Sequence, residues 1–330
     1  MPFFSGVASI AILATSLPIA DAYNSSSSIW VDQIPTYVRP YAIRGCVVGQ
    51  QIYRFLVTGP SSDSAFTLIS TNAPGSTSLG VLPHIHQTHY ETFFNYRGRF
   101  QLWTEKYDDE ETRVLIPGDY GAVPYNTTHT FQILDPDTEM VGDLFYALAS
   151  RNYSSITSSP YDPSITSDSS LAGSDSSVIS ILQVFDVYAQ LDYSPRRDAI
   201  NGTAPSNTTW HTGDNTLAAY SNTPYFVTKD YGPKYLSTIA GYQIIQPLVT
   251  PTQSAGNFTL STITMDRLLK NVTIQDQNFP GHAAFEVLEG QLQVLLDGEL
   301  YYSTVAFTKI LHIGQGYANL DTTLIANSTS

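Results

Sequence analysis

The chain has 330 residues, and 15 Lys and Arg against 29 Asp and Glu give it a formal net charge of −14. This acidic balance argues against nucleic acid as the main partner, because its field would repel a phosphate backbone. Hydrophobic residues make up 42% of the chain and aromatic residues 12%, enough for a large core, which excludes wholesale disorder. The one cysteine excludes an intramolecular disulfide framework and any cysteine-rich metal site.

The first 22 residues are predicted to be a signal peptide. An apolar stretch leads to Ala20-Asp21-Ala22, and small residues at this spacing are typical of a signal-peptide cleavage site. No Lys or Arg precedes the apolar part, so a strand buried in the fold is the alternative interpretation. No later apolar run reaches the roughly 18 residues of a membrane-spanning segment.

Eight Asn-x-Ser/Thr triplets accompany this leader. Together with it they favour a secreted, extracellular glycoprotein, because such triplets accept N-linked glycans. Asn126 stands three residues before a candidate metal ligand, His129, and is not expected to carry a glycan. The seven glycosylation candidates are Asn24, Asn152, Asn201, Asn207, Asn257, Asn271 and Asn327.

Short segments rich in β-branched and aromatic residues predict an all-β protein. Examples are 52–58, 66–69 and 291–296, and Gly, Pro, Asn, Asp and Ser separate such segments along the chain. Many short strands with this punctuation are typical of a sandwich or a barrel.

Parts of the first half of the chain recur in the second half at a constant offset of 192 residues. The tripeptide Leu-Val-Thr at 56–58 recurs at 248–250, and Phe-Thr-Leu at 66–68 recurs at 258–260. Chance matches would scatter in offset, so the sequence predicts a duplicated β domain.

A polar connector separates the two copies. Ser, Thr, Pro and Asp dominate 154–177, a composition from which no core can be built. Beyond it, apolar residues at helical spacing predict a short helix before Pro195, with a strand as the alternative; they are Val178, Ile181, Leu182, Phe185 and Tyr188. The predicted organisation is a signal peptide at 1–22, an N-terminal domain with the metal site at 23–150, a linker and connecting helix at 151–209, and a C-terminal domain at 210–330.

Three of the seven histidines lie within six residues of the chain. On a strand, His84 and His86 would share one face, because side chains alternate with a period of two. Glu91 and His129 can complete a metal site with them if the chain doubles back; surface histidines are the alternative for the pair alone. Three imidazoles and a carboxylate suit a divalent transition metal such as Cu, Ni, Fe, Mn or Zn, and not an oxygen-rich calcium or magnesium site. His89 is out of phase with the pair and is expected beside the site.

The spacing of these residues resembles that of the two metal motifs of the cupin superfamily. The first motif matches 80–91, which six residues separate from Gly98, and the second matches 118–129. Asn126 stands where the second motif commonly has glycine, and Asn is the residue that, after Gly, best tolerates a left-handed turn. The resemblance implies a metal held by His84, His86, Glu91 and His129.

The second copy carries no comparable ligand set. An offset of 192 from the four ligands leads to Asp276, Asn278, Ala283 and Asp321, which include no imidazole. We therefore expect a metal-free C-terminal copy and one transition metal ion per chain. Only 40 residues follow Gly290, so this copy is also expected to be shorter by about a hairpin.

A secreted, acidic, two-barrel cupin with metal in its first barrel is similar to the copper-dependent quercetin 2,3-dioxygenases, or quercetinases, of fungi. The similarity is densest at 53–62, 71–91, 118–140 and 185–189. It implies an all-β bicupin fold, in which two jelly-roll-like cupin barrels are joined by the Ser-rich linker and the short helix. It also implies Cu(II) as the metal, and a flavonol and O2 as substrates.

The resemblance further implies a chemistry. The flavonol would bind Cu(II) through its deprotonated 3-hydroxyl, with Glu91 both as a metal ligand and as the catalytic base that takes the proton. Opening of the heterocyclic ring by O2 would then expel carbon monoxide and leave a depside, a phenolic carboxylic ester. A flat substrate needs an aromatic-lined cleft, and the candidate substrate-binding residues, each with core packing as the alternative, are Tyr53, Phe93, Phe131 and Met140.

Two other functions compete with this one. A bicupin oxalate oxidase or decarboxylase would use manganese, but the apolar neighbours of the predicted site do not suit a small dianion. A non-catalytic binding or storage cupin is favoured by the blank second copy and by segments that look short against the quercetinase family after Arg44 and Val141. The intact ligand quartet argues against it.

Overall fold

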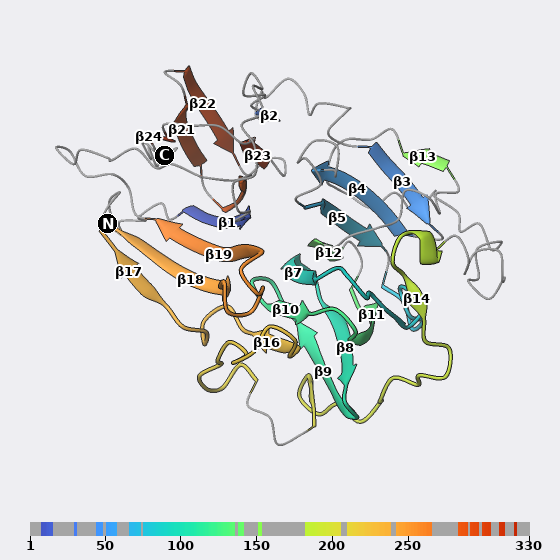
Figure 1. The fold of residues 1–330 in the computed structure, drawn as a ribbon. Helices are drawn as coiled ribbons and strands as arrows, with labels where there is room; N and C mark the ends of the chain where they lie inside the picture. Colours follow the sequence, from blue (N-terminus) through green and yellow to red (C-terminus); the bar gives the residue numbers. More distant parts are fainter. Residues whose placement is uncertain are drawn as a thin grey trace. The chain divides into compact units, whose positions relative to one another are not determined.

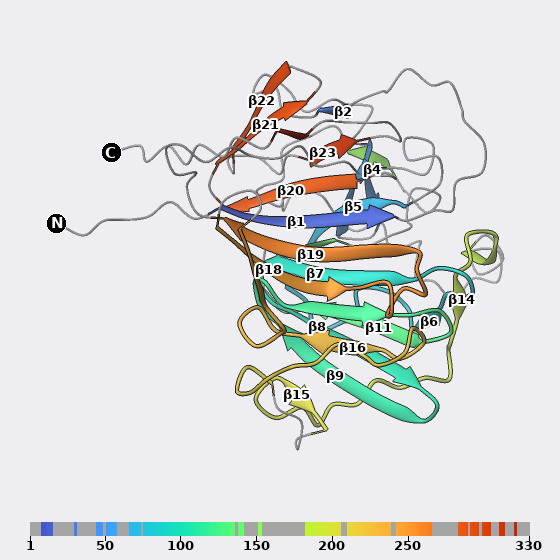
Figure 2. The same cartoon turned by 60° about the vertical axis from the view of Figure 1, so that its left-hand side comes forward.

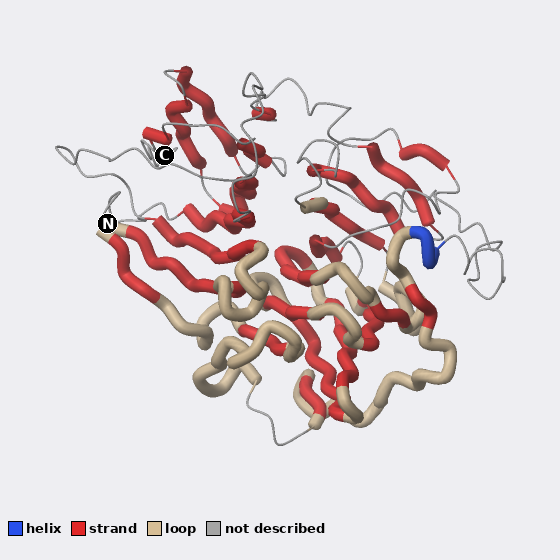
Figure 3. Tube along the Cα trace, viewed as in Figure 1, coloured by secondary structure: helices blue, strands red, loops and turns tan. Residues whose placement is uncertain are grey.

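The computed structural model describes the residues 8–15, 30–31, 44–48, 51–57, 66–73, 75–135, 138–141, 151–153, 182–205, 210–238, 242–265, 283–289, 291–296, 299–304, 310–313 and 320–321. Within them nearly every regular element is a β-strand, and the one helical turn spans 182–184 (Figures 1 and 3). The all-β prediction is therefore confirmed. The chain divides into two compact units, which we call the first unit (Ile43–Leu56 and Thr67–Gly232) and the second unit (Met1–Ala42, Val57–Phe66 and Pro233–Ser330).

The described strands of the first unit form two sheets, in which antiparallel pairing dominates. The larger sheet has the order β13 (Arg151–Tyr153), β3 (Arg44–Val48), β4 (Gln51–Val57), β5 (Leu68–Ala73), β12 (Thr138–Val141), β7 (Glu91–Arg97), β10 (Tyr120–Val123) and β16 (Tyr225–Val227). The smaller sheet has the order β14 (Tyr188–Ala189), β6 (His84–Ile85), β11 (Thr128–Ile133), β8 (Phe100–Lys106), β9 (Asp109–Leu115) and β15 (Thr203–Ala204).

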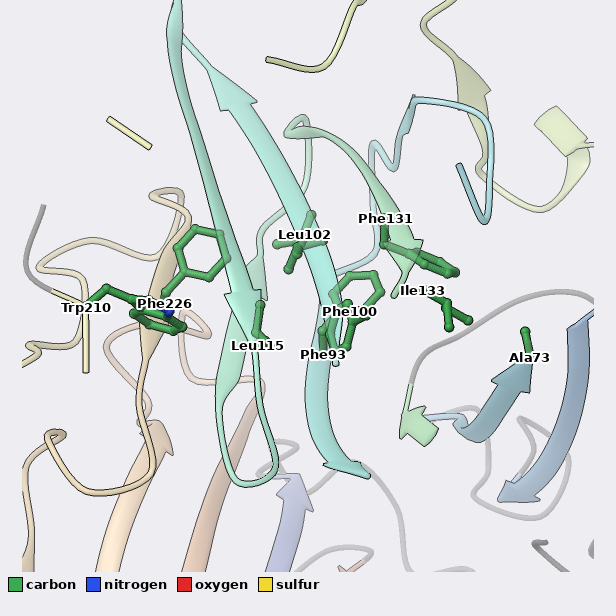
Figure 4. Close-up of a cluster of buried hydrophobic side chains, with 10 residues drawn as sticks. Ala73, Phe93, Phe100, Leu102, Leu115, Phe131, Ile133, Trp210 and Phe226 are labelled. Atoms are coloured by element: carbon green, nitrogen blue, oxygen red, sulfur yellow. The ribbon is translucent and has the colours of Figure 1, made fainter. Parts of the chain in front are cut away.

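The core of the first unit is built from side chains of both sheets (Figure 4). Phe93 and Phe226 come from the larger sheet, and Phe100, Leu102 and Phe131 come from the smaller one. Side chains along a strand alternate between its faces, so each strand can turn apolar residues toward the other sheet and polar ones away from it. The burial of these rings supplies the hydrophobic stabilisation that holds the two sheets together.

Residues 210–232 belong to the first unit, although the sequence predicts them to be part of the C-terminal domain. Strand β16 pairs with β10 at the edge of the larger sheet, where Phe226 lies opposite Gly121. Trp210 is 5% exposed, and its Nε1 donates a hydrogen bond to the carbonyl of Val114 at 3.1 Å. The segment is held because it covers an open sheet edge and buries two large apolar side chains. The remaining predicted boundaries stay predictions.

The second unit repeats the strand scaffold of the first. One sheet has the order β17 (Tyr235–Ser237), β18 (Gln243–Val249), β19 (Phe258–Met265), β1 (Ala8–Thr15), β20 (Ala283–Glu289), β23 (Ile310–Ile313) and β2 (Trp30–Val31), and the other β22 (Glu299–Thr304), β21 (Gln291–Leu296) and β24 (Leu320–Asp321). Strands β4 and β18 have the same bounds after an offset of 192 residues, and so do β7 and β20. The predicted duplication is confirmed.

Strand β1 lies between β19 and β20, with which it pairs antiparallel on its two sides (Figure 2). Strand β12 has the corresponding place in the first unit, between β5 and β7. The segment predicted to be a signal peptide is thus a strand here, as its alternative interpretation has it, and cleavage after Ala22 would remove this strand from the sheet. The signal peptide stays a prediction, as does the shortening of this copy.

The connecting helix is short in the part of the chain that the structure describes. It ends at Val184, and a turn follows, because Asp186 has a left-handed φ of 63°. Tyr188, which fits the predicted helical spacing, lies instead in β14 opposite Ile85. Residues 154–181, which include the predicted linker and the start of the helix, lie outside the described residues. None of the described helical segments has the length and apolar character to cross a membrane.

Candidate metal centre

Four side chains that the sequence predicts as metal ligands converge in the first unit. Their ligand atoms all lie within 4.8 Å of one another, and all four side chains are buried; the residues are His84, His86, Glu91 and His129. Glu91 and His129 are separated by 38 positions in the chain and meet at one point, as the cupin motifs imply.

Short strands position these side chains. Strand β6 lies beside β11 (Figure 2). This pairing places His84 directly opposite His129, with ring centroids 4.1 Å apart. His86 follows β6, and Glu91 begins β7. The His86 carbonyl accepts a hydrogen bond from the N–H of Asn126 at 2.6 Å. Asn126 has a φ of 57°, so it adopts the left-handed turn expected at this motif position.

Each of the three imidazoles donates its Nδ1–H to a backbone carbonyl. Because a carbonyl can only accept, these contacts assign the proton of each neutral ring to Nδ1 and leave the Nε2 lone pair toward the centre. The Nδ1–O distances are 2.7 Å from His84 to Leu82, 2.9 Å from His86 to Asp186 and 3.0 Å from His129 to Thr127.

The Glu91 carboxylate meets two of these nitrogens. Its Oε2 lies 3.1 Å from His86 Nε2 and 2.7 Å from His129 Nε2. With the Nδ1 protons assigned above, two imidazole lone pairs face a carboxylate oxygen at these distances, so either a proton on Nε2 or a metal cation must lie between the atoms. The donor set therefore fits a divalent transition metal with nitrogen and oxygen ligands.

Burial and the neighbouring side chains shift the pKa values of three of the four residues. Burial, together with neighbouring His129 and His86, holds the pKa of His84 well below 6.5, so its imidazole is neutral at neutral pH. Burial raises the pKa of Glu91, but the charge and hydrogen bonds of His129 and His86 outweigh it and hold this pKa well below 4.5. Burial lowers the pKa of His86, but Glu91 outweighs it and raises this pKa. The Glu91 carboxylate is thus ionised and stabilises positive charge at the two neighbouring imidazoles, where a bound metal cation would also be stabilised.

The four candidate substrate-binding residues lie at different places around the ligands. Phe93 and Phe131 belong to the core, and the ring centroid of Phe93 is 6.0 Å from those of Phe131 and His129. Tyr53 is 2% exposed, and its hydroxyl donates to Gln51 Oε1 at 2.7 Å. The backbone of Met140 in β12 lies opposite those of Asn95 and Thr71, and its side chain is outside the described residues.

One partner of the ligands is a residue that the sequence analysis did not single out. Asp186 accepts the His86 Nδ1–H through its carbonyl, and its carboxylate lies 2.8 Å from His89 Nδ1. His89 is exposed and stands beside the four ligands. Burial raises the pKa of Asp186, but the hydrogen bonds of Thr88, Gln87 and His89 outweigh it and lower this pKa to about 2. The one sequence signal for Asp186 is its place in the segment 185–189, where the similarity to quercetinases is dense.

The second unit differs at the equivalent positions. Ala283 is fully buried in β20, and Asp321 lies in β24. Asp276 and Asn278 lie outside the described residues. Over the described residues, both groups of His, Cys, Asp and Glu that are spaced to hold a metal belong to the first unit, and they share His86.

This fold and this site define a class of protein. Paired antiparallel sheets with a His-x-His pair, a glutamate and a more distant histidine, on a scaffold that occurs twice, make the chain a bicupin with a candidate metal site in its first cupin. Among solved structures, a point mutant of the oxalate decarboxylase of Bacillus subtilis is similar at 12% identity and a TM-score of 0.45, over 94% of this chain and 77% of that one.

Sequence comparison specifies the family within that class. The chain is 48% identical over 335 residues to the quercetin 2,3-dioxygenase of Aspergillus japonicus, which covers 91% of this chain and 95% of that protein. It is 28% identical over 145 residues to the quercetin 2,3-dioxygenase of Bacillus subtilis (strain 168), over 42% of this chain and 40% of the other. No family model matches the chain. The chain belongs to the quercetin 2,3-dioxygenase family.

Proposed function

We propose that this protein is a secreted copper enzyme that uses O2 to open the heterocyclic ring of flavonols such as quercetin, with release of carbon monoxide and a depside. The observation that carries the proposal is the convergence of three buried imidazoles and one carboxylate, with all ligand atoms within 4.8 Å of one another. The identity of 48% over nearly the whole length of a quercetin 2,3-dioxygenase supports the reaction class.

The ligand geometry supports separate roles for the four side chains. His84, His86 and His129 would hold the metal through Nε2, because each Nδ1 is engaged by a carbonyl. Bound Cu(II) would supply the Lewis acidity and one-electron chemistry that a flavonol needs to react with O2. Glu91 is the anionic member of the quartet, so we assign it the additional role of accepting the 3-hydroxyl proton of the flavonol at a carboxylate oxygen.

A flavonol is flat and aromatic, and we propose that Tyr53, Phe93, Phe131 and Met140 contact it. The support is strongest for Phe93, whose ring centroid is 6.0 Å from that of His129. Phe131 packs against Phe93 and against Gly80, where an added Cβ would collide with the ring. For Tyr53 the support is a chain of hydrogen bonds that leads to the first metal motif. Its hydroxyl donates to Gln51 Oε1, and Gln51 Nε2 donates to the carbonyl of Gly80, the first residue of that motif.

Metal content and turnover of the purified protein test this function together. We expect about one copper ion per chain by elemental mass spectrometry, loss of flavonol absorbance in air, and one carbon monoxide released per flavonol. Copper-loaded protein that leaves every flavonol unchanged would overturn the proposal. Manganese content together with consumption of oxalate would favour the competing bicupin activity instead.

Secretion and glycosylation form the second part of the proposal. Asn201 and Asn257 are exposed, which supports their use as glycan acceptors. Expression in a secreting eukaryotic host should yield a protein that begins near Tyr23 and loses mass when treated with an endoglycosidase. Retention of Met1 with no change of mass would overturn this part and would favour the pairing of β1 with β19 and β20 in the mature protein.

A further inference from the structure

The segment 182–190 belongs to the stretch predicted as linker and connecting helix, and it contacts the candidate metal site of the first unit. Its turn is closed by hydrogen bonds from the N–H of Phe185 to the carbonyl of Leu182 at 2.9 Å and from that of Asp186 to Gln183 at 3.1 Å. Beyond the turn, β14 pairs with β6, so that Ala189 lies opposite His84. Strand β14 is therefore the edge strand of the smaller sheet and lies next to β6, the strand that carries His84.

The carboxylate of Asp186 organises the turn between two ligands, His86 and Glu91. Its Oδ1 accepts the N–H of Gln87 at 3.1 Å. Its Oδ2 accepts the N–H of Thr88 at 2.8 Å, the Thr88 hydroxyl at 2.7 Å, the N–H of His89 at 3.1 Å and His89 Nδ1–H at 2.8 Å. Hydrogen bonds to an ionised acceptor are roughly twice as strong as neutral ones. One side chain thus holds three consecutive residues of the turn.

The backbone of the same residue orients a ligand. The carbonyl of Asp186 accepts the Nδ1–H of His86 at 2.9 Å, and its φ of 63° is left-handed, a conformation that Asp adopts more readily than most residues. His84 and His129 are oriented by carbonyls two positions earlier in the chain. The carbonyl that orients His86 comes instead from 100 residues further along.

We propose that Asp186 is a positioning residue that docks the end of the linker onto the 87–89 turn and thereby sets the ring orientation of His86 and its separation from Glu91. The inference rests on the proposed metal-binding function. Asp186 does not act as a ligand of a second metal with His86 and His89, because five hydrogen bonds already engage its two oxygens.

Three variants separate the contributions of the side chain and of the backbone. Asp186→Gly keeps the left-handed turn and the carbonyl but removes the carboxylate, and Asp186→Ala also strains the turn. Asp186→Asn keeps one acceptor oxygen and tolerates the same φ, so it is the conservative variant. Asp198→Ala is the matched control, because Asp198 lies in the same connector and is exposed, with Arg196 as its partner at 2.8 Å.

The readouts are copper retention against a competing chelator, the Cu(II) electron paramagnetic resonance spectrum, and amide hydrogen exchange at 87–89. We expect Asp186→Gly and Asp186→Ala to weaken copper binding about 10- to 100-fold, the usual cost of removing an outer partner of a metal ligand. Their spectra should change and their 87–89 amides should exchange faster. Asp186→Asn should recover part of the loss, and Asp198→Ala should match the wild type.

A wild-type spectrum, copper affinity and amide exchange in Asp186→Gly would overturn the proposed role. This outcome is distinct from failure of the proposed function: wild-type protein that binds copper but cleaves no flavonol overturns the function, while the variants still report on Asp186. If Asp186→Gly and Asp186→Ala do not fold, the test rests on Asp186→Asn. A Cu(II) spectrum and 87–89 exchange rates identical to wild type in Asp186→Asn would contradict an anchor that depends on the charge of the carboxylate.

Discussion

The two units have matching strands but different centres. Strands β7 and β20 have the same bounds after an offset of 192 residues, yet β7 begins with the ligand Glu91 and β20 with Ala283, which is fully buried. A buried carboxylate is tolerated only with partners, and in the first unit His86 and His129 supply them. The comparison teaches that the scaffold does not depend on the site, because the backbone pairing that builds the sheets uses none of the imidazoles.

The units also fill one strand position differently. In the first unit β12 lies between β5 and β7. In the second unit the equivalent position, between β19 and β20, is occupied by β1, which lies near the start of the sequence. A sheet position requires a backbone that can complete two ladders and does not require a particular place in the sequence. The proposed metal site is more demanding, because it needs specific side chains on or next to β6, β7 and β11, together with the proposed anchor at Asp186.

The largest expected contrast between the units is in metal content. His129→Ala removes one of four ligands, so we expect its copper, measured by elemental analysis after dialysis, to fall from about one equivalent to nearly none. Asp321→Ala changes the equivalent position of the second unit and should keep the full equivalent. Loss of metal in Asp321→Ala, or two equivalents in the wild type, would show that the second unit is not metal-free.

Catalysis should depend on the carboxylate that the second unit lacks. Glu91→Gln keeps the size of the side chain but removes its basicity, so we expect most of the copper to remain and flavonol cleavage to fall at least ~10²-fold. Asp119→Asn is the control, since Asp119 is a buried carboxylate of the first unit that pairs with His211 at 2.7 Å and accepts the N–H of Ile116. A copper-replete Glu91→Gln with wild-type turnover would remove the base role.

Introducing a glutamate at Ala283, the position equivalent to Glu91, tests whether the second unit tolerates a buried carboxylate without the imidazoles. Ala283→Glu should lower the free energy of unfolding by about 3 kcal/mol, because it buries a charge at a position whose site equivalents, Asp276, Asn278 and Asp321, include no imidazole. Ala283→Gln introduces nearly the same volume without the charge and should cost less. Denaturant titration of both variants measures the difference, and equal losses would indicate that size rather than charge decides this position.

The smallest expected effect concerns a surface ion pair. Arg99 and Asp135 of the first unit lie 2.7 Å apart, while the equivalent positions of the second unit hold the neutral Gln291 and Asn327. A double-mutant cycle with Arg99→Gln and Asp135→Asn should give a coupling energy of about 0 to 1 kcal/mol at neutral pH, because both groups are partly exposed.

The same cycle has a pH dependence with a definite sign. The hydrogen bond from Arg99 lowers the pKa of Asp135 in the folded protein below the ordinary 3.8. The coupling is therefore fully present above pH 3.8 and is lost as the pH falls through the lowered pKa. A coupling that stays constant down to about pH 1, well below the ordinary pKa of an aspartate, would contradict this origin.

The sequence by itself determined the all-β class and the duplication, and it indicated the four side chains that the fold brings together as the candidate ligands. His84 and His86 could be placed on one face because strand alternation is a local rule, and Glu91 and His129 followed from a motif spacing that short hairpins preserve. The placement of these four residues could be predicted because their separations along the chain already limit their geometry.

Only the tertiary structure decided which distant segments complete these elements. Asp186 reaches His86 across 100 residues, Trp210 and β16 pack on the first unit, and β1 pairs with β19 and β20. Many strands could pair with an open sheet edge, and many carbonyls could accept an Nδ1–H. The particular partner therefore leaves no periodic signal in the sequence. The choice among them depends on the packing of the whole unit, which is decided only when the chain has folded.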